Sequence, residues 1–159
     1  MLKKTIQLLA YPLISLVLLS FGLLKNGYQY ECMSLNTDGY VILKMWNPSK
    51  GHKYKLEQAR KDAIRVVLFS GIAGTGQCST QPPLLSNSEE MTKFNAEKKT
   101  FFTANGDWNL FTRSASSDAV VNLDQKDKKW RFYQIAVSKN ELRKKLEDQN
   151  IIKKLNNGF

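Results

Sequence analysis

The spacing of apolar residues predicts a hairpin followed by a helix in the first half of the chain. Two apolar and aromatic runs, at 28–35 and 40–46, have the composition of strands, and Asp38-Gly39 between them is typical of a tight turn. From Tyr54 to Phe69 the apolar period changes to three and four residues, which indicates one helical face. Glycines and prolines then predict a loop from Ser70 to Ser88. The apolar face of the helix carries Leu56, Ala59, Ala63 and Val67.

Two further helices are predicted by their start signals. Ser86 with Glu89, and Ser138 with Glu141, have the spacing of a capping box, in which the two side chains satisfy free amides at the start of a helix. The apolar residues of the first of these helices are Met91, Phe94, Phe101 and Phe102, and those of the second are Leu142, Leu146 and Ile151.

Together these patterns predict one α+β domain. Trp108, Leu110 and Phe111 indicate a short buried segment, the polar stretch 113–118 indicates a connection, and 129–137 alternates with the period of a strand. We expect a mixed or antiparallel sheet of about four strands with three helices packed on it, spanning residues 28–155 and followed by a frayed tail at 156–159. The residues expected to pack the longer helices on the sheet are Ala59, Ala63, Phe94, Phe101 and Leu146.

An apolar leader precedes this domain. Residues 5–24 are almost uncharged and follow two lysines, which is typical of a signal peptide or of a single membrane anchor. Pro12 inside the run and the small residues Ser20 and Gly22 favour cleavage, whereas the length of the run is sufficient for a retained anchor in contact with the membrane. With residues 1–24 as a cleaved signal, we expect a periplasmic or outer-membrane-associated protein. With a retained anchor, we expect a domain that faces the periplasm from the inner membrane.

The positive net charge of the chain limits the classes of molecule that the domain is expected to bind. It has 24 Lys and Arg residues against 14 Asp and Glu, a net charge of +10, and removal of Lys3 and Lys4 lowers this by two, to +8. A basic exported domain meets anionic lipid headgroups, acidic glycans or acidic proteins, and its compartment argues against nucleic acid. The alternative is that the lysines only keep the domain soluble.

Catalytic and metal signatures are weak. Cys32 and Cys78 are an isolated pair, which in an oxidising compartment forms a disulfide or stays free. A thiol hydrolase would need a base beside a cysteine, and His52, the only histidine, lies in a lysine-rich turn. The glycines at 71–76 follow a helix, unlike those of a phosphate-binding loop. We therefore assign no catalytic, cofactor-binding or metal-ligating residues, and expect no enzymatic activity.

The best functional candidate is a cationic face. A basic stretch with an aromatic residue precedes and forms the start of the last strand, and a second basic group lies on the last helix, so strand and helix could present them together. The alternative is a solvated helix face beside a turn. The candidate residues for an anionic surface are Lys128, Lys129, Trp130, Arg131, Arg143, Lys144 and Lys145.

Several segments resemble known proteins. The helix at 59–72, the pair Phe101-Phe102, the sequence 142–147 and Ile151-Ile152 resemble small exported proteins of uncharacterised function from Bacteroidetes, over most of residues 40–155. The order of elements is also similar to that of LPP20- and FlgT-like envelope modules, although no lipid-attachment cysteine is present. The resemblance implies a non-enzymatic accessory module of the cell envelope that binds a protein partner or assembles into a surface complex. Alternatives are a binder of anionic glycan or lipid and, more distantly, a thiol hydrolase.

Overall fold

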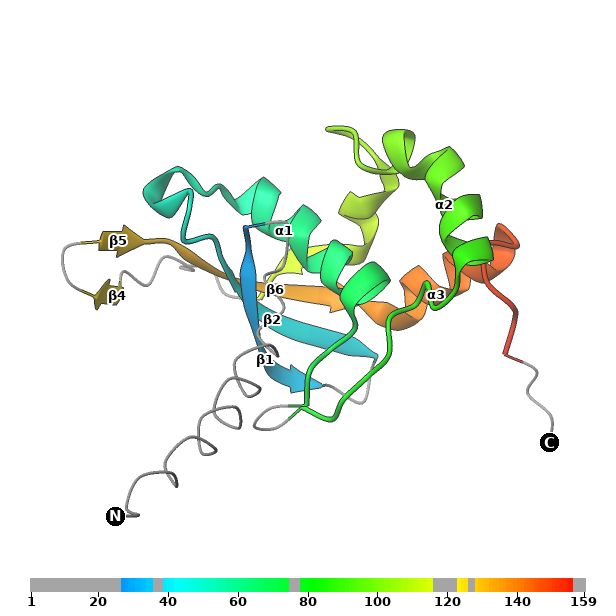
Figure 1. Cartoon of the computed structure of the whole chain (residues 1–159), viewed down its shortest axis with the longest axis horizontal. Helices are drawn as coiled ribbons and strands as arrows, with labels where there is room; N and C mark the ends of the chain where they lie inside the picture. The colour runs from blue at the N-terminus through cyan, green and yellow to red at the C-terminus, as the bar shows by residue number, and fades with distance from the viewer. Residues whose placement is uncertain (1–26, 36–38, 75–77, 116–122, 126–127, 156–159) are drawn as a thin grey trace, which may run out of the picture.

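The computed structural model of the protein is an α+β fold built on a four-stranded antiparallel sheet (Figure 1). It describes residues 27–35, 39–74, 78–115, 123–125 and 128–155, with the backbone alone for 123–125 and 128–130. The predicted α+β class is confirmed, and the sheet is antiparallel throughout rather than mixed. The predicted leader at 1–24 and tail at 156–159 lie outside the described residues. In the described part of the chain, no helix has the length and apolar character needed to cross a membrane.

The first two strands form the predicted hairpin. β1 (Gln29–Leu35) pairs antiparallel with β2 (Tyr40–Trp46), with a register irregularity between Cys32 and Ser34. Gly39 enters β2 with a φ of 79°, a backbone conformation that favours glycine. Alternate residues of β2 are buried, so one face of this strand lies on the core and the other does not.

The third and central strand comes from the far end of the chain. β6 (Phe132–Ser138) pairs along its whole length with β2, and its other edge pairs with β3 (Thr112–Ser114), which gives the order β1-β2-β6-β3. Two corrections follow. The single strand predicted from 129 to 137 is interrupted at Arg131, and the polar stretch predicted as a connection from Arg113 begins within an edge strand. β4 (Leu123–Gln125) and β5 (Lys128–Trp130) form a separate two-stranded sheet.

α1 (Leu56–Arg65) lies across one face of the main sheet, and α3 (Lys139–Asp148) continues from the end of β6 (Figure 1). α1 follows a short 3-10 turn, η1 (Gly51–Lys53), and continues into a π-helical turn, η2 (Val66–Ser70), so the predicted helix is confirmed in extent. α2 (Ser88–Phe101) is followed by the 3-10 segment η3 (Asp107–Phe111). All five residues expected to pack the helices on the sheet are buried.

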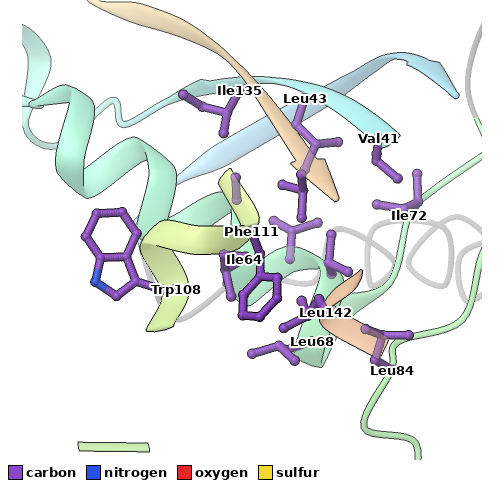
Figure 2. Packing of buried hydrophobic residues seen from close by; sticks show 14 of the residues in the cluster. Val41, Leu43, Ile64, Leu68, Ile72, Leu84, Trp108, Phe111, Ile135 and Leu142 are labelled. Atoms are coloured by element: carbon purple, nitrogen blue, oxygen red, sulfur yellow. The ribbon is translucent and has the colours of Figure 1, made fainter. Parts of the chain in front are cut away.

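The core fills the space between the sheet and these helices. Figure 2 shows Leu43 and Ile135 of the sheet in one cluster with Ile64 of α1, and all three are fully buried. Three expected core residues are exposed instead, among them Leu56 at the start of α1. Met91 lies on the outward side of α2, and Leu110 of η3 is 75% exposed because only Trp108 and Phe111 of that segment turn inward.

The helix starts differ in detail from the predicted capping boxes. Asn87 caps α2 by accepting a hydrogen bond from the amide of Glu90, while the carboxylate of Glu90 accepts from the amide and hydroxyl of Ser86. The pairing of Ser86 with Glu89 is therefore wrong by one position. Ser138 is the N-cap residue of α3 as predicted, but its side chain makes no capping hydrogen bond, so the second box does not form.

Candidate binding surfaces

A disulfide joins the two cysteines of the chain. The Cys32 and Cys78 sulfurs are bonded, with their Cα atoms 6.1 Å apart, and the bond ties the loop between η2 and α2 to β1. The Tyr30 hydroxyl donates to the carbonyl of Gly71 at 3.0 Å and holds the start of the same loop. Because neither sulfur is a free thiol, no thiolate is present for the hydrolase hypothesis, and His52 lies exposed in η1.

The predicted cationic face is divided by the length of β6. Lys128, Lys129 and Trp130 form β5 and Arg131 lies exposed before β6, whereas the other three cations lie on α3 after it. Seven strand residues at about 3.3 Å each separate the two groups by roughly 20 Å. Figure 1 shows β5 and α3 at opposite ends of β6. The structure therefore does not bring the two groups together.

The cations of α3 differ in their partners. Arg143 Nε lies 2.8 Å from Glu147 Oε1, and Lys145 Nζ lies 2.9 Å from Asp107 Oδ2. Lys144 is exposed and forms no ion pair within the described part of the chain. Two of the three predicted binding cations on this helix are thus already paired with a carboxylate, which reduces the positive charge available to an external anion.

A different surface is formed by the sheet face that no described helix covers. We call it the outer face, and its β2 residues Tyr40, Ile42, Lys44 and Trp46 are half-buried. Phe132 lies beside Trp46 with ring centroids 5.8 Å apart. The residues of the outer face include Gln29, Glu31, Tyr40, Ile42, Lys44, Trp46, Arg113, Phe132, Gln134 and Ala136, of which Phe132 and Ala136 are themselves buried.

Cations lie against the aromatic rings of the outer face. Lys44 Nζ is 5.1 Å from the ring centroid of Phe132 and 6.0 Å from that of Trp46, and it is 3.4 Å from the carboxylate of Glu31. At the other end of β2, the guanidinium of Arg113 lies 4.5 Å from the ring centroid of Tyr40. These contacts hold long, mobile side chains over flat apolar surface. The face therefore combines aromatic area with positioned positive charge.

The outer face was not predicted from the sequence. The alternation of β2 was a usable signal, because every second residue from Tyr40 to Trp46 points away from the core. What the sequence did not supply was the pairing of Trp46 with Phe132 and the position of β3 beside β6, which bring residues from three distant segments together.

A buried polar cluster surrounds Asp62 of α1. Its carboxylate accepts hydrogen bonds from the Tyr54 hydroxyl at 3.0 Å and the Gln58 amide at 2.9 Å, and it lies 2.6 Å from Arg65 Nη1. Burial raises the pKa of the Tyr54 hydroxyl far above its usual value, and the nearby Asp62 carboxylate raises it further. The Tyr54 carbonyl in turn accepts from the hydroxyl of Tyr133. Both carboxylate oxygens of Asp62 and the hydroxyls of Tyr54 and Tyr133 have partners within the cluster, so it fixes α1 on the sheet.

The described residues contain no group of three or more His, Cys, Asp or Glu side chains placed to hold a metal ion. Comparison with known proteins gives no relative from which a function could be transferred: no family model, no curated protein and no solved structure matches this chain.

Proposed function

We propose that the protein is a non-enzymatic accessory module of the cell envelope that binds a protein partner through the outer face of its sheet. The observation that carries this proposal is the pairing of Trp46 with Phe132 under the cation of Lys44, on a face that no described helix covers. Aromatic residues and arginine are enriched where protein interfaces draw their binding energy. Lys44 is paired with Glu31, whereas Arg113 forms no ion pair among the described residues, so an acidic group on the partner is expected opposite Arg113.

Two features support an extracytoplasmic location for the proposed envelope role. The lysine pair at 3–4 and the apolar run at 5–24 have the features of an export signal or anchor. The disulfide between Cys32 and Cys78 is of the kind that persists in oxidising compartments. We therefore propose that the domain works in the periplasm, either released and associated with the outer membrane or anchored to the inner membrane.

Site-specific photo-crosslinking in the native membranes tests the proposed interface. A photoreactive residue at Ile42, in the centre of the outer face, is expected to trap one defined protein. The same residue at Lys99, which is exposed on α2, is the matched control and is expected not to trap it. Trp46→Ala should then abolish the product, because truncating an aromatic residue that anchors an interface typically costs about 2 kcal/mol or more. Identical products from both positions, or monomer alone, would refute the proposal.

A second candidate is the binding of an anionic glycan or lipid. It is favoured by the unequal pairing of charges: six described carboxylates form ion pairs, whereas Lys144, Lys153 and Lys154 are exposed and have no ion pair among the described residues. This candidate predicts retention on heparin or on anionic liposomes that high salt removes and that Lys144→Glu with Lys145→Glu eliminates. Retention that is insensitive to salt would contradict it.

A further inference from the structure

A cavity of about 230 Å³ lies where the first turn of α3 meets the start of β2. Its polar side is lined by Tyr40 of β2, Gln81 of the loop before α2, and Lys139, Asn140 and Arg143 of α3. Leu35, Val41 and Leu155 give it an apolar side. The cavity is thus formed by segments from across the whole domain.

Two cations converge on this cavity without a carboxylate between them. Lys139 and Arg143 are four residues apart on α3 and therefore lie on the same side of the helix. None of the described lining residues is acidic. Burial lowers the pKa of the Lys139 ammonium, and the nearby Arg143 lowers it further. An anion in the cavity would relieve this repulsion.

Among the described residues, the Lys139 ammonium and the terminal nitrogens of Arg143 face no carboxylate. They therefore remain available to a ligand. The Lys139 ammonium donates to the side-chain oxygen of Gln81, a neutral acceptor that leaves its charge uncompensated. Glu147 lies at the Nε edge of Arg143, and in the described part of the chain the two terminal nitrogens of that guanidinium have no hydrogen-bond acceptor. An arginine edge with two parallel N–H groups fits an oxyanion, and a lysine adds a point charge.

The polar side of the cavity is held in place before any ligand binds. The carbonyl of Gly39 accepts from the amide of Lys139 at 3.0 Å, and a Cβ on Gly39 would lie 2.1 Å from the Asn140 amide nitrogen, so β2 and α3 touch closely here. Gln81 exchanges two backbone hydrogen bonds with Ile72, at 2.8 and 3.0 Å. A site whose walls are fixed in this way loses little entropy on binding.

We propose that this cavity binds a phosphate monoester group, with Lys139 and Arg143 contacting the phosphate oxygens and the apolar side accommodating the adjoining carbon chain. The volume suits the ester group of a larger molecule rather than the whole of a large ligand. The same group occurs on soluble sugar phosphates and on membrane lipids. The site shares Tyr40 with the outer face, but its two cations, Lys139 and Arg143, lie on α3 outside that face, so substitutions at these two positions test it separately from the proposed partner protein.

Calorimetric titration of the full chain in detergent with glycerol 3-phosphate tests the site, with glycerol as the uncharged comparison. Lys139→Gln and Arg143→Gln should each raise the dissociation constant about tenfold or more, because a hydrogen bond to a charged group contributes about 1.5–3 kcal/mol. Lys144→Gln removes the same charge from the exposed side of the same helix and is expected to change the constant less than about twofold. Lys139→Arg, which keeps the charge, should retain most of the binding.

Vesicles containing phosphatidic acid, tested against vesicles of neutral lipid, distinguish a lipid source from a soluble one. Equal losses in Lys139→Gln and Lys144→Gln would show general electrostatic attraction and overturn the proposal. So would the absence of saturable binding of glycerol 3-phosphate and of phosphatidic acid vesicles by a chain whose thermal unfolding is intact. The photo-crosslinking at Ile42 reports on the partner protein separately, so the two proposals fail by different observations.

Discussion

Removal of the disulfide is expected to cost about 4 kcal/mol of unfolding free energy. Cys32 and Cys78 are 46 residues apart in sequence, and closing a loop of that length in the unfolded chain accounts for this value in the chain-entropy treatment. Both cysteines are 6% exposed, so replacing them with alanine also removes packed sulfur atoms. A domain of this size is typically stable by about 5–15 kcal/mol, so the loss is a large share of the total.

The native fold should nevertheless survive reduction. The loop that carries Cys78 is also held by the backbone pairing of Ile72 with Gln81 and by hydrogen bonds from Leu84 to Val67 and from Leu85 to Leu68. The bond therefore acts mainly by limiting the unfolded chain, not by creating the loop.

Urea unfolding of three samples separates these effects: the oxidised chain, the same chain after reduction, and the Cys32→Ala, Cys78→Ala double variant. The oxidised and reduced samples have the same side chains, so their difference measures the crosslink alone. The double variant should be somewhat less stable than the reduced chain because of the lost packing. A difference below about 1 kcal/mol between oxidised and reduced chain would refute the argument from loop length.

Three other substitutions are expected to lower stability in the same urea assay. Asp62→Ala should cost about 3 kcal/mol or more, because it leaves the buried Tyr54 hydroxyl without its acceptor, and Asp62→Asn, which keeps an acceptor, should cost less; equal losses would contradict this reason. Phe94→Ala should cost about 3–5 kcal/mol, since this ring contacts three other phenylalanine rings, and a loss below about 1 kcal/mol would show that the cluster repacks around the gap. Gly71→Ala should cost about 2 kcal/mol because φ is 74° and the added Cβ would lie 2.5 Å from the Gln81 carbonyl oxygen; an unchanged midpoint would show that the backbone relaxes.

The elements with strong local signals were predictable from sequence. α1 was found because Ala59 and Ala63 recur at helical spacing, and the hairpin because two apolar runs flank Asp38-Gly39. β3 was missed because it has only three residues and one of them, Arg113, is a solvent-exposed cation. The cap of α2 was placed one residue early because Ser86 and Asn87 are both good capping residues and only the backbone decides between them.

The candidate binding sites depend on contacts that sequence spacing does not report. The predicted face joined Arg131 with Arg143 because they are close in sequence, but a straight strand carries them apart. The cavity brings Lys139 beside Gln81, which is 58 residues away in sequence, and the outer face pairs Trp46 with Phe132. Such pairings require the strand register and the loop path, which no local pattern contains.

The position of β6 in the sheet has a consequence for synthesis of the chain. β6 lies between β2 and β3, yet its residues, Phe132–Ser138, are among the last to be translated. Until they leave the ribosome, β2 and β3 lack the strand that lies between them, and the core lacks the buried residues of that strand. The nascent polypeptide therefore cannot complete its native sheet for nearly all of elongation. If the chain is exported as proposed, this late pairing favours an incompletely folded chain at the stage when it would cross the membrane.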